Sequence, residues 1–237
     1  MNLFYHPQIE IGKKLLLDSS ESKHLILVLR KNVGESVFLT NGNGGLFEAE
    51  ILVADSKKTR VHVHKRIKSQ SITAEFHIAI APTKNISRFE FFLEKATEIG
   101  VSEITPLICR RSERRKLNIE RLHKKMVNGM KQSQNLCLPI LNTAANFDVF
   151  CRENKFATSG SQKFICSCEK ETELLKTKMR EGKNTLVLVG PEGDFSKEET
   201  NLAIDSGFET VSLGDRRFRV ETAGILACHT FFNKNQI

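Results

Sequence analysis

Residues 186–196 read LVLVGPEGDFS, and this stretch decides the fold of the larger part of the chain. The apolar run is typical of a strand that is buried on both faces, and it leads directly into the turn GPEG at 190–193. The two glycines keep side chains away from the backbone where the strand ends, and Pro191 stiffens the turn. A helical pattern then begins at Ser196. This order favours an α/β sheet with a ligand near the end of the strand.

A second turn of the same kind lies at 212–224, where SLGDRRFRVETAG leads from the strand ETVSL into the last helix. Gly214, like the glycines of the first turn, leaves the backbone without a side chain. Three arginines then precede a helix start at Glu221. Either turn alone could be an ordinary connection with solvated charges. Together, at what we expect to be adjacent strand ends of one sheet, they favour a ligand site.

Strands and helices alternate after about residue 72, which predicts a mainly parallel α/β sheet with helices on both faces. The expected strands are EFHIAIAP, SEITPLICR, KFICSC, TLVLVG and ETVSL. The expected helices are ISRFEFFLEKATEIG ending at Gly100, Asn118 to about Gln134, 169–181, 196–206, and about Glu221 to Phe232.

Residues 1–70 have a different pattern, which predicts strands and one short helix. Ser20 is the expected N-cap of that helix. Alternating runs on both sides of Asn41–Gly45 predict a β-hairpin, and the glycines there indicate a turn rather than a phosphate loop. A further strand follows in TRVHVHKRIK. We therefore expect a small basic β domain at 1–70 and an α/β domain at 71–237.

The formal net charge of +8 over 237 residues favours a polyanionic partner. Basic residues form the block CRRSERRK at 109–116, continue along the next helix, and recur in KTRVHVHKRIK. One charged run is more often a solvated surface, but patches in both domains favour RNA. The candidate RNA contacts are Arg30, Arg110, Arg111, Arg114, Arg115 and Gln132.

The six cysteines show no CxxC pair and no zinc-ligand spacing, so we expect reduced core thiols and no metal. His62 and His64 share one strand face without an evident third ligand. The first residues lack the pattern of a signal peptide, and no apolar run reaches membrane-spanning length. These patterns predict a cytoplasmic protein without a membrane partner.

GPEGDFSKEE, LGDRRFRVETA, KATEIGV at 95–101 and HLILVLR together resemble the ribosomal RNA small subunit methyltransferase E family, over nearly the whole chain and in the same order. That family methylates N3 of a uridine (1498) in 16S rRNA. The resemblance implies a PUA-like RNA-binding β-barrel domain at 1–70 and a SPOUT domain with a trefoil knot at 71–237. It also implies S-adenosyl-L-methionine as cofactor, 16S rRNA of the small ribosomal subunit as partner, and a homodimer formed through the knot domain.

By motif position, the resemblance implies cofactor contacts on both turns. They are Gly190, Pro191, Glu192 and Gly193 on one side, and Leu213, Gly214, Arg219, Glu221, Thr222 and Ala223 on the other, with Ile165 and Ser167 as weaker candidates. Arg219 is the first candidate for catalysis and Lys84 the second. The uracil N3–H must lose its proton, and an arginine, which stays protonated, can stabilise the anion that forms. No residue is identified as the general base.

The chain departs from the family pattern at Asp194, Arg217 and Asn135. Aspartate tolerates a left-handed backbone, so the first turn can survive its substitution. Two alternative functions stay open, because glycine-rich turns do not specify the RNA target. One is a SPOUT methyltransferase that acts on another RNA or on a ribose hydroxyl. The other is a non-catalytic RNA-binding ribosome-assembly factor, which the retained motifs and Arg219 argue against.

Overall fold

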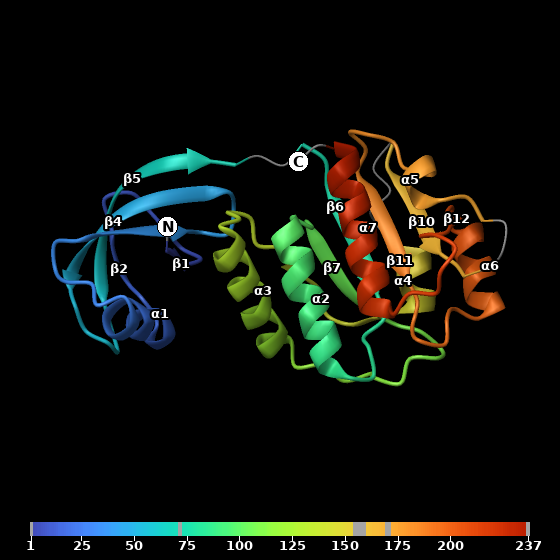
Figure 1. Ribbon diagram of the computed structural model, residues 1–237, viewed down its shortest axis with the longest axis horizontal. Coiled ribbons are helices and arrows are strands. Elements are labelled where there is room, and N and C mark those ends of the chain that lie inside the picture. Colours follow the sequence, from blue (N-terminus) through green and yellow to red (C-terminus); the bar gives the residue numbers. More distant parts are fainter. Residues whose placement is uncertain (1, 71–72, 154–159, 169–171, 236–237) are drawn as a thin grey trace. The chain divides into compact units, whose positions relative to one another are not determined.

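The computed structural model describes residues 2–70, 73–153, 160–168 and 172–235. The chain forms two compact units (Figure 1). The first unit is Met1–Ser71 with Val127–Leu138, and the second is Ile72–Met126 with Pro139–Ile237. The division that we expected at residues 70 and 71 did not include the second segment of the first unit, 127–138.

The first unit is built on a curled five-stranded sheet in the order β1-β3-β4-β5-β2. The strands are β1 (Leu3–Tyr5), β2 (Lys14–Leu16), β3 (Ser36–Thr40), β4 (Gly45–Val53) and β5 (Arg60–Ser69). β3 and β4 form the predicted hairpin, with Thr40 opposite Leu46. In its turn, Gly44 has a φ of 80°, and a Cβ there would collide with the carbonyl of Gln70. The glycine-rich stretch is therefore a turn, as predicted.

The short helix of the first unit begins earlier than predicted. It consists of α1 (Ser19–Lys23), which continues as the π-helix η1 (His24–Val28). The N-cap is Asp18 and not Ser20, because the carboxylate of Asp18 accepts hydrogen bonds of 2.8 Å from the N–H groups of Ser20 and Glu21. An aspartate two residues earlier reaches both free donors, which leaves Ser20 inside the helix.

The segment 127–138 is held in the first unit by polar contacts. Lys131 forms an ion pair with Glu21, and both side chains are mostly buried. The Leu136 carbonyl accepts hydrogen bonds from the Thr40 hydroxyl at 3.2 Å and from the Gly44 N–H at 2.9 Å. Because these partners are distant in sequence, the local sequence pattern does not reveal them. The pattern therefore assigned the segment, together with the rest of its helix, to the α/β domain.

The second unit contains a parallel sheet in the order β12-β10-β11-β6-β7-β8, with β9 also paired to β7. Its strands are β6 (Phe76–Ile80), β7 (Glu103–Ile108), β8 (Ile140–Leu141), β9 (Ala145–Asn146), β10 (Gln162–Cys166), β11 (Thr185–Val189) and β12 (Glu209–Val211). Its helices are α2 (Ile86–Ile99), α4 (Phe147–Glu153), α5 (Leu175–Lys178), α6 (Lys197–Asp205) and α7 (Val220–Asn235), while α3 (Ile119–Ser133) runs from this unit into the first.

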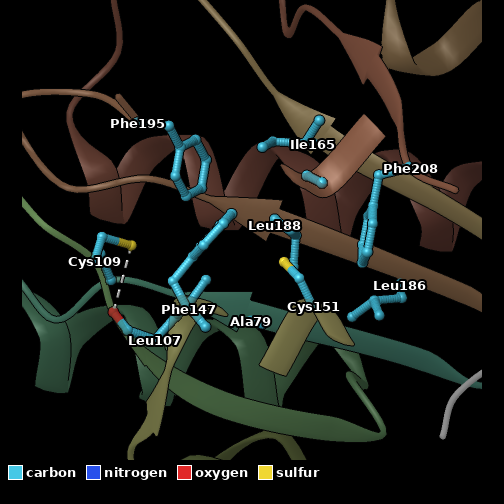
Figure 2. Close-up of a cluster of buried hydrophobic side chains, with 12 residues drawn as sticks. Ala79, Leu107, Cys109, Phe147, Cys151, Ile165, Leu186, Leu188, Phe195 and Phe208 are labelled. Atoms are coloured by element: carbon cyan, nitrogen blue, oxygen red, sulfur yellow. Dashed lines mark hydrogen bonds between the residues drawn. The ribbon is translucent and has the colours of Figure 1, made fainter. Parts of the chain in front are cut away.

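Helices cover both faces of this sheet, as predicted. α2 and α7 lie side by side on one face (Figure 1), where the rings of Phe76 and Phe231 stack at 4.8 Å. α4 and α6 lie on the other face, where Phe147 packs into a buried cluster (Figure 2). Side chains of β6 enter the hydrophobic packing on both faces of the sheet, because successive side chains of a strand point to opposite faces. Ile80 meets α7, and Ala79 belongs to the cluster on the α4 side.

Two helix predictions differ from the structure. α4 was not expected, and the helix expected at 169–181 is reduced to α5 among the described residues, with 169–171 lying outside them. The N–H of Ser212 donates to the Glu173 carbonyl at 2.8 Å, and the N–H of Leu175 donates to the Ser212 carbonyl at 2.8 Å. Residues 173 and 174 are therefore extended, because they pair with the chain just after β12.

Candidate active site at the carboxyl edge of the sheet

The two glycine turns lie at the same edge of the sheet. β11 and β12 both run parallel to β10, so all three strands end on one side. The expectation of adjacent strand ends is wrong in one respect, because β10 lies between β11 and β12. At the usual spacing between strands, the two strand ends are about 9 to 10 Å apart. Ser167 lies at the end of β10, where its N–H donates to the Val211 carbonyl at 2.9 Å.

Side chains from both turns converge on Cys168, which directly follows this strand end. Partial burial and the nearby Asp194 carboxylate raise the pKa of the Cys168 thiol, while a hydrogen bond with Arg217 lowers it. Asp194 belongs to the first turn and Arg217 to the second. Two of the three positions at which the chain departs from the family pattern, Asp194 and Arg217, therefore both lie beside Cys168.

The conformation of the first turn is fixed by hydrogen bonds of its own residues. Asp194 has a φ of 63°, its N–H donates to the Pro191 carbonyl at 2.9 Å, and its carboxylate accepts from the Phe195 N–H at 2.8 Å. The left-handed backbone that we expected an aspartate to tolerate is thus present. A Cβ on Gly190 would lie 3.1 Å from the Phe195 ring. Gly190 is therefore required by the packing of Phe195, which points into the core against Phe147 (Figure 2).

The other glycines of the two turns have different surroundings. A Cβ on Gly193 would lie 3.3 Å from Cδ of Arg111. Gly214 has a φ of 142°, and its nearest neighbour would be the ring of Phe218 at 3.8 Å, an ordinary contact. Within the described chain, the main-chain N–H groups of Gly193 and Leu213 donate to no protein acceptor. The turns thus present main-chain donors to a ligand.

Lys84 follows β6 and is linked to the first turn. Its N–H donates to a carboxylate oxygen of Glu192 at 3.0 Å, and its ammonium lies 2.8 Å from Glu113. The hydrogen bond and charge of Glu113 raise the pKa of Lys84. Glu113 therefore favours the charged form of Lys84.

Arg219 lies at the start of α7, where its carbonyl accepts from the Ala223 N–H at 2.8 Å. Its side chain is exposed, and its guanidinium has no hydrogen-bond or ion-pair partner among the described residues. Glu221 is buried two residues further on, with Nε of Arg88 at 3.8 Å from its carboxylate. Arg88, in the first turn of α2, was not singled out in the sequence because a lone arginine in an amphipathic helix carries no pattern.

The remaining predicted residues are spread over both units. Thr222 is exposed and Ala223 half-buried on α7, whereas Ile165 is fully buried in the core cluster and its main chain is paired to β11 on one side and β12 on the other. The four arginines of the block lie in the loop after β7 in the second unit. Arg30, with a φ of 54°, and Gln132 are exposed in the first unit.

Metal and membrane features can be tested only in the described parts of the chain. Residues there form no group of three or more histidine, cysteine or acidic side chains that could hold a metal ion. None of the helices among them combines the length and the apolar character that crossing a membrane requires.

Comparison with known proteins identifies relatives over the whole chain. An RNA methyltransferase domain model matches residues 70–231, and an RNA methyltransferase PUA domain model matches residues 17–63. The ribosomal RNA small subunit methyltransferase E of Rickettsia conorii is 28% identical over 229 residues, which cover 95% of this chain and 92% of the relative.

Two solved structures have the same fold along their full length. A structure from Porphyromonas gingivalis, described as a probable rRNA-methyltransferase, is 34% identical, with a TM-score of 0.90 and coverage of 100% of this chain and 99% of that one. A methyltransferase from Legionella pneumophila, solved with the bound cofactor SAM, is 27% identical, with a TM-score of 0.86 and coverage of 98% and 97%.

Proposed function

Because this chain belongs to the RNA methyltransferase family matched over residues 70–231, and within it to the ribosomal RNA small subunit methyltransferase E family, we propose that it methylates 16S rRNA with S-adenosyl-L-methionine as methyl donor. The proposed target is N3 of one uridine, of the 1498 type. The observation that carries the proposal is the meeting of both glycine turns with the end of β10 at one edge of the sheet.

The groups at this edge fit the cofactor. The Legionella relative binds SAM on the same fold. In this chain the free N–H groups of Gly193 and Leu213 would match acceptor atoms of the ligand, and the side-chain-free Gly214 lets it approach the backbone. The residues proposed to hold the cofactor are Gly190, Pro191, Glu192, Gly193, Leu213, Gly214, Arg219, Glu221, Thr222 and Ala223, with Ile165 and Ser167 as the weaker candidates.

When bound, S-adenosyl-L-methionine supplies a methyl group that is already activated on a sulfonium, so the protein need not provide a nucleophile. What remains for the protein is to align the uracil and to stabilise the charge that N3 acquires on losing its proton. The Arg219 guanidinium, which pairs with none of the described side chains, is suited to that anion because it stays protonated and offers several donors. Lys84 adds a second cation beside the first turn.

Basic groups in both units support the RNA half of the proposal. The first unit matches the PUA domain of RNA methyltransferases, and Lys65, Arg66 and Lys68 are exposed on its strand β5. Contacts of cations with phosphates position an RNA and weaken with added salt. The trefoil knot, the homodimer through the second unit and the cytoplasmic location rest on the family resemblance and complete the proposal.

The test of this proposal combines titration with S-adenosyl-L-methionine and mass mapping of 16S rRNA after incubation with the protein. We expect cofactor uptake and one added methyl group on one uridine base. A protein that takes up no cofactor would instead be a binding-only assembly factor. Cofactor uptake with methylation of another RNA, or of a ribose, would move the activity to a different target.

Arg219→Ala tests the role of the arginine within the same assay. We expect the methylation rate to fall by about 100- to 1,000-fold, the range seen when one preorganised donor to a developing anion is removed. The dissociation constant for S-adenosyl-L-methionine should stay within a few-fold, because main-chain groups supply most contacts. Full activity in this variant would remove Arg219 from the mechanism.

A further inference from the structure

The loop after β7 carries arginines whose side chains point at main-chain carbonyls of neighbouring loops. Arg111 donates from Nη1 to the Gly193 carbonyl at 2.6 Å and lies 3.5 Å from the Phe195 carbonyl. Its Cδ also fills the space beside Gly193 that a larger residue would occupy. Arg111 therefore braces the back of the first glycine turn.

Arg114 braces the loop after β6 in the same way. Its Nε and Nη2 donate to the Lys84 carbonyl at 3.1 and 2.8 Å, and its Nε lies 3.2 Å from the Thr83 carbonyl. This side chain is half-buried, unlike that of its neighbour Arg115. A planar guanidinium can reach two acceptors at once, whereas a lysine ammonium acts as a point charge.

Further bonds join the three loops into a closed ring. Lys84 donates its N–H to Glu192 of the first turn, while its ammonium pairs with Glu113 of the arginine loop. The arginine loop is anchored in turn to Glu199, one carboxylate oxygen of which accepts from the Arg110 N–H at 2.8 Å. The other oxygen of Glu199 accepts from the Ser196 N–H, in the capping box of α6. Movement of any one loop would strain the other two.

We propose that Arg111 and Arg114 are positioning residues for the methyl-donor site and do not serve as phosphate contacts. The inference rests on the proposed function and revises it, because both residues were candidates for RNA binding. Nη1 of Arg111 is engaged with the Gly193 carbonyl, and Nε and Nη2 of Arg114 are engaged with the Lys84 carbonyl. Arg115 differs, since its one hydrogen bond among the described residues, to the Arg110 carbonyl at 3.4 Å, stays within its own loop. The Arg110 side chain pairs with Glu198 of α6 at 3.0 Å, so among the described residues Arg115 is the arginine of this block whose side chain is bound to no other loop or helix, and it is available for phosphate.

The test uses variants that keep the charge and remove the planar fork. Arg111→Lys and Arg114→Lys are compared with Arg115→Lys, a matched control in the same loop. Titration with S-adenosyl-L-methionine should give a dissociation constant about ten-fold higher for the first two and unchanged for the control, since a lost charged hydrogen bond has this order of effect. The affinity for a 16S rRNA fragment and its salt dependence should be unchanged in all three.

A neutral variant checks Arg115, which keeps its assignment as an RNA contact. Arg115→Ala should lower the slope of log K against log salt for the rRNA fragment by about 0.7 to 0.9, the value for one phosphate contact. Its affinity for S-adenosyl-L-methionine should equal that of the wild-type protein. An unchanged slope would show that Arg115 does not contact phosphate and would overturn this part of the inference.

Stability is controlled by thermal unfolding followed by circular dichroism. If a lysine variant does not fold, Glu113→Gln opens the same ring at the Lys84 ammonium, away from the residues proposed to hold the cofactor, and should also weaken cofactor binding without changing the salt slope. Folded lysine variants with an S-adenosyl-L-methionine dissociation constant within two-fold of wild type would overturn the inference. Absence of cofactor binding by the wild-type protein would instead overturn the proposed function, so the two failures are distinguishable.

Discussion

Gly190→Ala separates two reasons for a glycine at the first turn, room for a ligand or room for the protein's own side chain. An added Cβ would lie 3.1 Å from the Phe195 ring and 3.2 Å from the Phe195 nitrogen. The ring cannot easily move away, because it is 7% exposed and packs against Phe147 with centroids 5.3 Å apart. Gly190 must therefore be small even without a ligand.

The expected loss of stability follows from these contacts. Overpacking a filled core by one methyl group typically costs about 1 to 3 kcal/mol. For a chain of this size each kcal/mol lowers the melting temperature by roughly 2 to 4 °C, so the ligand-free variant should melt about 2 to 12 °C lower than wild type. Gly193→Ala is the control, since its Cβ would meet only the exposed Arg111 side chain, at 3.3 Å, and should change the melting temperature less.

The assay is thermal unfolding of both variants in the absence of S-adenosyl-L-methionine. A Gly190→Ala protein as stable as wild type, with only its cofactor affinity reduced, would refute the packing argument. The glycine would then be explained by the ligand alone, as the sequence first indicated.

Two further predictions concern the sheet beneath the site. Burial lowers the pKa of His77 to about 4, against the smaller opposing effect of Glu103. The unfolded chain therefore binds more protons than the folded one between about pH 6.5 and 4, and stability should fall across this window as the pH falls, by about 1.4 kcal/mol per pH unit where the difference is complete. Urea unfolding at several pH values measures this loss, and an equally steep loss in His77→Gln would exclude His77 as its cause. In Gly224→Ala the new Cβ would lie 2.6 Å from the Phe92 ring and 2.7 Å from Ile80 Cδ1, closer than real Cβ contacts, so either α7 or these buried side chains must shift. We expect a loss of about 3 kcal/mol in urea unfolding, and an unchanged midpoint would contradict the close packing of α7.

The sequence predicted the parts of this fold that depend on local pattern. The continuous apolar run of β11 and the helical spacing of α2, which ends at Gly100 with a φ of 103°, are examples. The composition and the order of the elements were sufficient to predict the parallel sheet, because alternating strands and helices can pack in only a few ways. The cofactor and the RNA partner were predicted from the family resemblance and not from these local patterns.

Features set by contacts distant in sequence were not predictable. Strand order is one, so the position of β10 between the two turns was missed. The extended residues 173 and 174 pair with Ser212, which overrides their local helical pattern. The arginine block shows the same limit at the site, because charge alone does not reveal that Arg111 and Arg114 are engaged with carbonyls.

The central claim is that both glycine turns and the end of β10 form one site for S-adenosyl-L-methionine. Cys168 reports on that site directly, because it is exposed and has Asp194 of one turn and Arg217 of the other beside it. Cys137, which is half-buried in the first unit, is the internal control. The measurement is the rate of thiol alkylation at each cysteine, read by peptide mass spectrometry.

At a cofactor concentration about 100 times the dissociation constant, almost all protein is in the bound form. The site described here predicts that alkylation of Cys168 slows at least ten-fold when S-adenosyl-L-methionine is added, while the rate at Cys137 stays the same. Equal rates at Cys168 with and without saturating cofactor would place the ligand elsewhere and contradict the site.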